Sequence, residues 1–177
     1  RAADLSVKDQ VESFADWCLH HGTPEILVNN AGTFLPGNVM DEPEGNLDLM
    51  MNINLYSAYH LTRKIVPAMM KTGKGHIFNI CSVASLQAYS GGGGYSISKY
   101  ALHGFSQNLR HELKEHGIKV TAVYPGAVLT DSWGNFDNIN GRIMEAADIA
   151  AMLQAASKLS VQAVVEDIII RPQLGDL

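Results

Sequence analysis

Residues 76–99 of the chain read HIFNICSVASLQAYSGGGGYSISK. Their first six letters, residues 76–81, form a short apolar run, which is the pattern of a strand buried in a parallel sheet. A loop with four glycines at residues 91–94 follows, and a helical pattern then runs over residues 95–116. A buried strand that leads into a loop and a long helix is part of a crossover unit, so this stretch predicts a parallel α/β sheet.

The same alternation of helices and strands extends over the rest of the chain. The apolar run at residues 26–28 predicts another strand, buried on both faces, and the helix before it is expected to begin at a Ser6 cap. Pro67 lies in the longest helical pattern and either kinks that helix or marks its last turn. The expected helices cover residues 7–20, 47–71, 95–116 and 146–159, and the expected strands cover residues 26–28, 76–81, 119–124 and 167–170.

The composition is that of an ordinary globular domain and excludes several classes of protein. The 177 residues are 46% hydrophobic, enough for one sizeable core, and the formal net charge of −5 offers no basic surface for nucleic acid or anionic lipid. No apolar run approaches the roughly 18 residues of a membrane span. Two cysteines, Cys18 and Cys81, cannot form a disulfide framework in a chain of this length, so we expect a reduced, cytoplasmic setting.

Three residues of the opening stretch bear side chains that can do chemistry. Ser82 follows directly after a predicted strand, at the edge where open α/β sheets bind ligands. Tyr95 and Lys99 are four residues apart at the start of the next helix, on one face of it. A phenol loses its proton at about pH 10, and an adjacent ammonium lowers that pKa, which makes the tyrosine a usable general acid or base. Taken alone, the pair is also explained by a surface lysine beside a half-buried tyrosine.

Further motifs stand in a consistent order around these three residues. Asn29-Asn30-Ala31-Gly32 follows one predicted strand, Asn54 lies in the longest helical pattern, and Pro125-Gly126-Ala127-Val128-Leu129-Thr130 follows another strand. Together with the serine, tyrosine and lysine above, they resemble the short-chain dehydrogenase/reductase family over nearly the whole chain. The resemblance implies a Rossmann-type, doubly wound parallel sheet in a single domain over residues 1–177.

The resemblance implies a catalytic role for four residues. Tyr95 would give a proton to a substrate carbonyl oxygen during reduction, or take one from an alcohol during oxidation, and Ser82 would hold that oxygen by a hydrogen bond. Lys99 would lower the pKa of Tyr95 and also bind the nicotinamide ribose. The main chain of Asn54 would anchor a water in the proton relay, and the hydride would come from the cofactor.

The resemblance also implies a cofactor site, with NADP(H) slightly preferred over NAD(H). Small residues in the loop after the first predicted strand would let the cofactor ribose approach the backbone. Asn29 is instead expected to tie neighbouring strands together. Asp4 matches the position that meets adenine in the family, although a cap at the start of a helix explains an aspartate there nearly as well. The expected cofactor residues are Asn30, Ala31, Gly32, Tyr95, Lys99, Pro125, Gly126, Val128, Thr130 and Asp4.

Three other features are interpreted without a ligand site. His111 and His116 are five residues apart, so they do not share a helix face as zinc ligands must, and no metal is expected. The glycines at residues 91–94 lack the lysine and hydroxyl residue of a phosphate-binding loop, and they serve either flexible substrate entry or plain loop slack. Cys81 ends a buried run, which favours packing over a nucleophilic role.

The sequence contains no glycine-rich turn of the kind that receives a dinucleotide pyrophosphate. In the family this turn lies in a first β-α-β unit, about fifty residues before the position of Asp4. We therefore expect the Rossmann-type sheet to be incomplete in this chain, with its four strands matching the fourth to seventh of the family. We also expect the natural protein to begin roughly 50 to 65 residues earlier.

The activity expected from the resemblance is hydride transfer between NAD(P)(H) and a small carbonyl or alcohol substrate. Residues 164–172 lack the Asp-Gly-Gly ending of 3-oxoacyl carrier-protein reductases and resemble sepiapterin reductase-like and 3-hydroxy acid dehydrogenase-like members, and Trp133-Gly134 fits the former. Alternatives are a 3-oxoacyl carrier-protein or 3-hydroxy acid dehydrogenase, or a binding protein or inactive piece without catalysis. Family members pair through their long helices, here residues 47–71 and 95–116, so a homodimer or homotetramer is expected, without nucleic acid or membrane partners.

Overall fold

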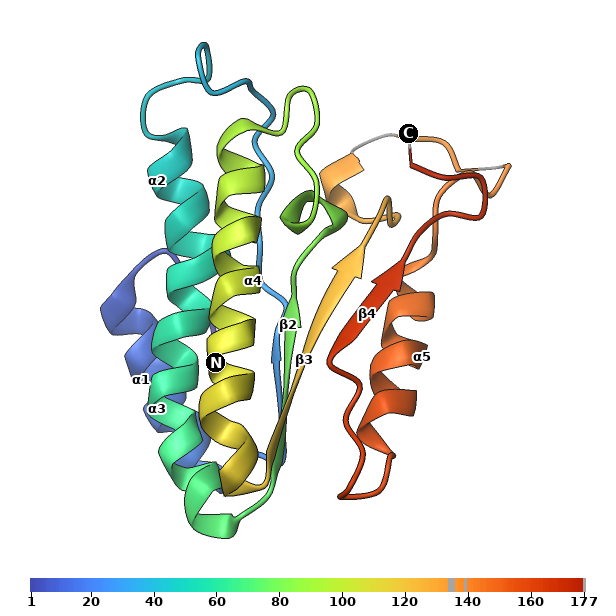
Figure 1. Ribbon diagram of the computed structural model, residues 1–177. Coiled ribbons are helices and arrows are strands. Elements are labelled where there is room, and N and C mark those ends of the chain that lie inside the picture. The colour runs from blue at the N-terminus through green and yellow to red at the C-terminus, as the bar shows by residue number, and fades with distance from the viewer. Residues whose placement is uncertain (134–135, 139, 177) are drawn as a thin grey trace.

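Four parallel strands form one sheet in the computed structural model, which describes residues 1–133, 136–138 and 140–176 (Figure 1). The strands lie side by side in chain order, and each neighbouring pair is parallel. This pairing confirms the expected α/β class, because each return to the same edge of the sheet needs a crossover connection. The strands are β1 (Ile26–Asn29), β2 (Gly75–Ile80), β3 (Ile118–Pro125) and β4 (Asp167–Ile170).

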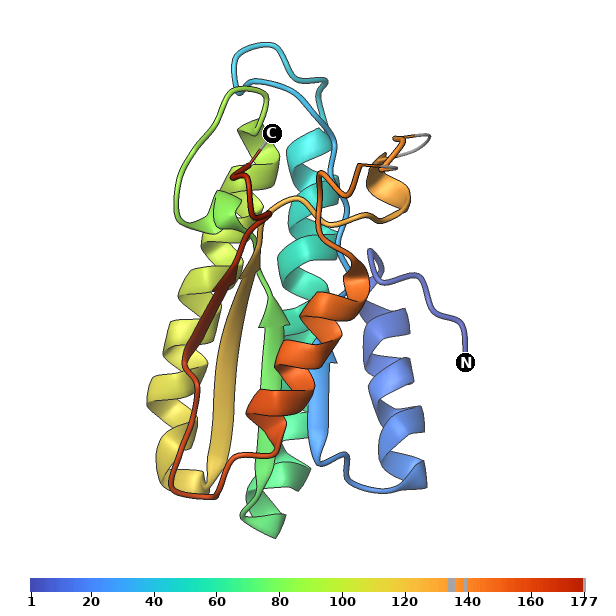
Figure 2. The ribbon, with the colours of Figure 1, turned by 90° about the vertical axis from the view of Figure 1, so that its right-hand side faces the viewer.

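Helices cover both faces of the sheet and give a three-layer arrangement (Figure 2). Helices α1, α3 and α4 lie on one face, and α5 lies on the other. The α-helices are α1 (Lys8–His21), α2 (Asn46–Met51), α3 (Ser57–Thr72), α4 (Gly93–Leu113) and α5 (Ala146–Ser157). A π turn, Asn52–Tyr56, joins α2 to α3, and short 3₁₀ turns occupy Val83–Ser85, Lys114–His116 and Asp131–Trp133.

The central strands β2 and β3 are buried on both faces, as their apolar runs predict. Ile77 is 0% exposed on the side of α3 and α4, and its neighbour Phe78 is 1% exposed on the side of α5. Val120 and Val123 of β3 repeat this division between the two faces. The core is therefore two apolar layers with the sheet between them, and it holds the carboxyl ends of β2 and β3 in fixed positions.

Strand β1 differs from its expected burial on both faces. Leu27 and Asn29 are buried beneath the helices, whereas Ile26 and Val28 are 49% and 41% exposed on the opposite face. The reason is the position of α5, which packs against Phe78 of β2 and the strands beyond it. Among the described residues, no helix covers β1 on that side. The apolar side chains of β1 are therefore buried on one face of the sheet and exposed on the other.

One expectation about a helix start is wrong, and one of the two alternatives for Pro67 is excluded. Ser6 does not cap α1, because both its N–H and its hydroxyl donate to Asp4 Oδ1, at 2.9 and 2.7 Å. Pro67 lies inside α3 and not in its last turn, since the helix continues to Thr72. A proline can stand there because the missing N–H removes one bond of the helix without ending it, although it costs stability.

Candidate active site

The predicted catalytic residues lie at the carboxyl edge of the sheet, the upper end in Figure 1. The loop after β1, the turn that contains Ser82 after β2 and the segment from Gly126 after β3 all start at this edge. Open α/β sheets bind their ligands there, because the connections on opposite sides of the strand ends leave space between them.

Ser82 is held in a fixed position by a small hydrogen-bonded turn. It is the N-cap of the 3₁₀ turn Val83–Ser85, and its Oγ accepts a hydrogen bond from the N–H of Ala84 at 3.1 Å. Its own N–H donates to Ser85 Oγ at 3.2 Å, which completes a capping box. Since Oγ accepts from the backbone, its proton is free to be donated, and the Ser82 side chain lies close enough to Tyr95 to lower the pKa of the phenol.

Tyr95 and Lys99 lie together on the first turns of α4, as their spacing predicts. Lys99 Nζ lies 5.8 Å from the centre of the Tyr95 ring and donates a hydrogen bond to the carbonyl of Ile80 at 2.9 Å. Lys99 is 4% exposed, so the alternative of a surface lysine beside the tyrosine does not describe this structure. The ammonium is anchored to the end of β2, beside the Tyr95 ring.

The pKa of Tyr95 differs from the expected direction. Burial raises it, the hydrogen bond with Ser82 lowers it, and Cys81 raises it further, with a net increase. Lys99 was expected to lower this pKa, but desolvation of the phenolate outweighs the favourable interactions. Burial also lowers the pKa of Lys99, to about 8, with an influence of Cys81 in the opposite direction. The site as it stands therefore favours a protonated phenol beside a lysine that is readily deprotonated.

Asn54 joins three parts of the site through its side chain. It lies in the π turn between α2 and α3 and is 1% exposed. Its Oδ1 accepts from the N–H of Thr33 at 2.7 Å, and its Nδ2 donates to the carbonyl of Thr33 at 3.0 Å and to Ser98 Oγ at 2.9 Å. The loop after β1 is thereby tied to α4, on which Ser98 precedes Lys99.

Gly32 lies against both Asn54 and Lys99, and because it has no side chain its backbone is exposed next to them. A Cβ atom at this position would lie 3.3 Å from Asn54 Oδ1 and 3.3 Å from Lys99 Nζ. Asn30, Ala31 and Gly32 are all exposed, whereas Asn29 is buried and donates to Thr62 Oγ1 and Asn79 Oδ1 at 3.0 and 2.7 Å. Asn29 thus ties β1 to β2, and the three residues after it form an open surface over the lysine.

The segment after β3 is held in place by hydrogen bonds to other segments of the chain. The N–H of Gly126 donates to the carbonyl of Ile170 at 2.8 Å, and a Cβ there would lie 3.1 Å from Pro172 Cδ. This close approach of the carboxyl-terminal segment explains a glycine without any ligand. Pro125 ends β3, Val128 forms a bridge with Met144, and the carbonyl of Thr130 closes a turn with the N–H of Trp133 at 3.0 Å.

Asp4 lies apart from this group of contacts. Its backbone N–H donates to Gln10 Oε1 at 2.8 Å, and its carboxylate accepts from the Ser6 side chain and backbone, which lowers its pKa. These local bonds at the start of α1 explain an aspartate without reference to adenine.

Two of the glycines at residues 91–94, Gly93 and Gly94, pack closely against the loop after β1 and against α2. A Cβ at Gly93 would lie 2.5 Å from the carbonyl oxygen of Gly37, and one at Gly94 would lie 2.9 Å from Met50 Cε. Glu42 Oε2 accepts a hydrogen bond from the N–H of Gly94 at 3.1 Å, a contact missed at the level of sequence. A run of glycines in the sequence indicates that another segment packs closely there, but it does not indicate that this segment is the loop with Glu42.

A family model described as short chain dehydrogenase matches residues 1–140. The chain belongs to this family. Among the described residues, no group of three or more His, Cys, Asp or Glu side chains is arranged to hold a metal ion, and no helix is long and apolar enough to cross a membrane.

Relatives within the short-chain dehydrogenases match nearly the whole chain. A sepiapterin reductase of Chlorobaculum tepidum is 36% identical over 89% of this chain, which spans 65% of the length of that relative. A metagenomic short-chain oxidoreductase, solved in complex with NADP, is 30% identical with a TM-score of 0.81, covering 98% of this chain and 73% of that one. An alcohol dehydrogenase of the archaeon Thermococcus sibiricus has a TM-score of 0.91 at 22% identity, covering 100% and 75% of the two chains, and this likeness supports the Rossmann-type fold.

Proposed function

We propose that this chain carries the catalytic residues of an NADP(H)-dependent carbonyl reductase, which acts in reverse as an alcohol dehydrogenase. The observation that carries the proposal is the convergence of the Ser82 hydroxyl, the Tyr95 phenol and the buried Lys99 ammonium at one point of the sheet edge. Chance pairing in a helix does not account for this arrangement, because Ser82 follows β2 whereas Tyr95 and Lys99 lie on α4, and Lys99 is bonded to the last residue of that strand.

The residues present fit a nicotinamide cofactor. The backbone at Gly32 leaves a cradle over Lys99 that a Cβ would fill, and Asn30 and Ala31 beside it are exposed. Lys99 would hold the ribose hydroxyls, and Pro125, Val128 and Thr130 would line the nicotinamide end at the neighbouring strand. When bound, the cofactor supplies or takes up the hydride. The metagenomic relative with bound NADP supports NADP(H) over NAD(H).

Tyr95 is the proposed proton donor to the substrate oxygen. Its raised pKa keeps the phenol protonated at neutral pH, which is the form required for carbonyl reduction. The Ser82 hydroxyl, held by the backbone on its acceptor side, has its proton available for the same oxygen and would stabilise the developing alkoxide. Asn54 would support the proton relay, since it joins the loop after β1 to α4 beside Lys99.

A carbonyl compound with a flat ring system is the substrate that the aromatic surroundings of Tyr95 favour. The Phe34 ring packs edge-on against the Tyr95 ring at 5.0 Å, and Tyr89, which is 49% exposed, is close enough for the two phenols to influence one another. With the 36% identity to a sepiapterin reductase, this supports a sepiapterin reductase-like activity over a 3-oxoacyl carrier-protein or 3-hydroxy acid activity. Of the pair Trp133-Gly134, the glycine lies outside the described residues.

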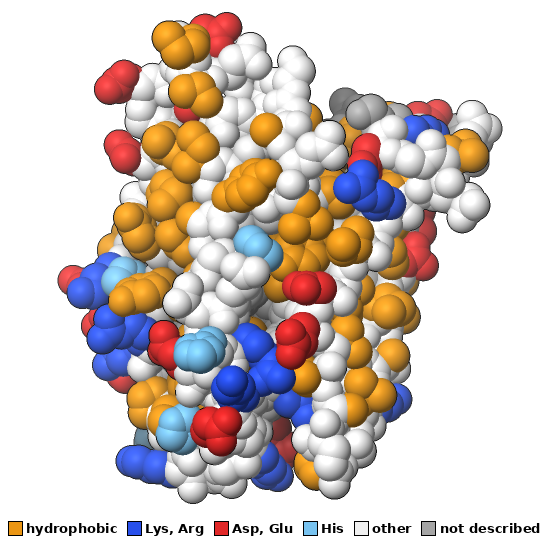
Figure 3. Space-filling model, viewed as in Figure 1, with side chains coloured by type: hydrophobic (Ala, Val, Ile, Leu, Met, Phe, Trp, Pro, Cys, Tyr) orange, Lys and Arg blue, Asp and Glu red, His pale blue; other side chains and the backbone are white. Residues whose placement is uncertain are grey.

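The proposal extends to assembly and location. Hydrophobic side chains gather over α2 and the adjoining parts of α3 and α4 (Figure 3), where Leu47, Tyr56, Ile97 and Tyr100 are exposed. This surface supports pairing of two copies through the long helices, as a dimer or as part of a tetramer. The two free cysteines, Cys18 and Cys81, support a cytoplasmic setting.

The test is turnover by the product of the full reading frame that encodes this sequence. NADPH oxidation is followed with a pterin, an aryl ketone, an aliphatic ketone and a 3-oxo acid. Tyr95→Phe is expected to lower kcat at least about 100-fold while NADPH binding persists, because only the proton donor is removed. Tyr59→Phe, which alters a hydroxyl bonded to Arg63 on the surface of α3, is the matched control and should be unaffected. Full activity of Tyr95→Phe would overturn the proposal, and so would NADPH binding without turnover of any substrate.

A further inference from the structure

Helix α4, which carries Tyr95 and Lys99, begins without a capping side chain of its own. Its N-cap residue is Gly92, and the first helical residues are Gly93 and Gly94. The first N–H groups of a helix have no partner within it, and an acceptor from elsewhere stabilises that end. Here the acceptor is Glu42, whose Oε2 accepts from the N–H of Gly94 at 3.1 Å across 52 residues of sequence.

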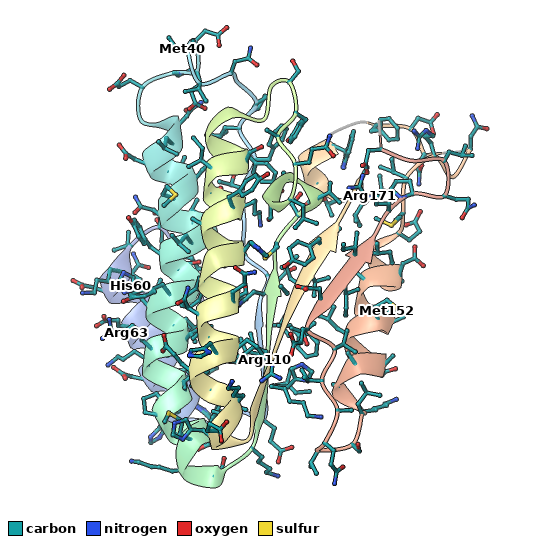
Figure 4. The ribbon with its side chains drawn as sticks, viewed as in Figure 1. Met40, His60, Arg63, Arg110, Met152 and Arg171 are labelled. Atoms are coloured by element: carbon teal, nitrogen blue, oxygen red, sulfur yellow. The ribbon has the colours of Figure 1, made fainter. Side chains whose placement is uncertain are left out.

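The segment that contains Glu42 is fastened to the start of α4 at several points. The N–H of Gly37 donates to the carbonyl of Gly91 at 3.0 Å, and the N–H of Gly91 donates to Asn38 Oδ1 at 2.9 Å. This segment is the loop between β1 and α2, which rises above the upper ends of α2 and α4 with Met40 near its tip (Figures 1 and 4). The loop therefore contacts the chain directly before Tyr95.

The glycines make room for the carboxylate itself. A Cβ at Gly94 would lie 3.1 Å from both carboxylate oxygens of Glu42, and one at Gly93 would lie 2.9 Å from Oε2. Glu42 thus sits in a recess that any larger residue would narrow. A negative charge in this place also interacts favourably with the positive end of the helix dipole.

Tyr95 follows Gly94 directly, so the start of α4 determines where the phenol lies. Phe34, which belongs to the same loop as Glu42, packs edge-on against the Tyr95 ring at 5.0 Å. The loop therefore restrains Tyr95 twice, at the ring through Phe34 and at the preceding peptide through Glu42.

We propose that Glu42 is a positioning residue, which holds the first turn of α4 so that the Tyr95 hydroxyl stays aligned with Ser82 and the substrate oxygen. This inference rests on the proposed role of Tyr95 as the proton donor. Glu42 acts through the Gly94 peptide, from whose N–H it accepts a hydrogen bond. Misplacement of a reacting group by about 1 Å can cost about 100-fold in rate, so a single bond at this helix end is enough to matter.

Three variants of the full reading frame test the role of Glu42. Glu42→Ala removes the acceptor, Glu42→Gln keeps a neutral acceptor oxygen, and Glu44→Ala alters an exposed glutamate of the same loop. We expect Glu42→Ala to lower kcat about tenfold or more with KM for NADPH within about twofold of the wild type. Glu42→Gln is expected to restore kcat to within about threefold, and Glu44→Ala to match the wild type. Because a loss of folding would lower the active fraction of Glu42→Ala, kcat is calculated per folded molecule, with the folded fraction of each variant measured by denaturant unfolding.

Amide hydrogen exchange gives a readout that does not depend on activity. Exchange at Gly94 and Tyr95 should be faster in Glu42→Ala than in the wild type, and slow again in Glu42→Gln. Unchanged exchange in Glu42→Ala would overturn the inference, and so would wild-type kcat in that variant. Tyr95→Phe keeps the two proposals apart. An active Tyr95→Phe overturns the proposed function, whereas an inactive Tyr95→Phe beside a fully active Glu42→Ala overturns the role of Glu42 alone.

Discussion

Lys99 Nζ donates a hydrogen bond to the carbonyl of Ile80, 2.9 Å away, so a lysine of α4 is anchored to the last residue of β2. The bond crosses from a helix on one face of the sheet to the edge where the strand ends. It fixes the ammonium beside Tyr95, and the Lys99 side chain is almost completely buried there. Because burying a charged group costs free energy, we expect a neutral side chain of similar size at this position to make the fold at least as stable.

Lys99→Met is accordingly expected to leave the fold as stable or more stable while it weakens NADPH binding. Burial lowers the pKa of Lys99 from 10.5 to about 8, which corresponds to about 3 kcal/mol between the two protonation states. Because the unfolded chain holds this proton more tightly, wild-type stability should rise from pH 8 to pH 10.5, and this rise should be missing in Lys99→Met. Urea unfolding at pH 7.5 and about 10, with NADPH titration, measures both effects. The same rise in both proteins would contradict the assigned burial.

Gly32→Val is expected to abolish NADPH binding without unfolding the protein. The added atoms would enter the space over Lys99, since a Cβ already lies 3.3 Å from Nζ. Gly104→Ala is the matched control, because a Cβ at that helical position meets nothing within 4 Å. The control should bind NADPH normally and gain about 0.5–1 kcal/mol in unfolding free energy. Fluorescence titration and thermal unfolding distinguish the two variants, and retained binding in Gly32→Val would refute the assigned position of the ribose.

Ser82→Ala should lower kcat about 100-fold and change KM for NADPH little, as expected for a group that contacts the substrate oxygen. The variant also loses the acceptor for the N–H of Ala84, so a stability loss of about 1 kcal/mol is expected. Ser160→Ala, on the exposed segment after α5, controls for the loss of a hydroxyl. Steady-state kinetics measure kcat and KM for NADPH in both variants. An effect of Ser82→Ala on KM for NADPH alone would contradict a contact between Ser82 and the substrate oxygen.

His76 predicts a specific sensitivity to acid. It is 5% exposed and hydrogen bonds through Nε2 to Thr121 Oγ1 at 2.7 Å, and burial lowers its pKa to about 4. The unfolded chain therefore binds a proton between pH 6.5 and 4 that the folded protein does not, and stability should fall over this window. The fall attributable to His76 is about 3 kcal/mol at most. Denaturant unfolding at pH 7 and pH 4.5 should show a smaller loss in His76→Leu, and equal losses would argue against this cause.

Regular patterns in the sequence predicted the parts of the fold that depend on neighbouring residues. The apolar runs around Ile77 and Val120 marked the two strands that the structure buries on both faces. The four-residue spacing of Tyr95 and Lys99 placed them on one face of α4, where they are found. Such features follow from periodicity along one element and need no knowledge of tertiary contacts.

Features that depend on distant partners could not be predicted in the same way. Glu42 and Gly94 are 52 residues apart, and nothing local in either stretch indicates the other. The exposure of Ile26 and Val28 depends on where α5 lies, which the β1 sequence does not contain. The pKa of Tyr95 is raised mainly by burial of its side chain. The four-residue spacing identified Lys99 as a charged neighbour, but it gave no information on how far the phenol is buried.

The π turn Asn52–Tyr56 has a consequence for the evolution of this segment. A π turn contains one residue more than an α-helical turn of the same rise, and each residue of a helix rotates its successors by about 100°. Deleting a residue there would restore a regular helix but turn Asn54 away from Thr33, or Ile65 and Met69 away from the core. A deletion between Asn54 and Ile65 is therefore incompatible with this architecture, because it would change which residues face the site and the core.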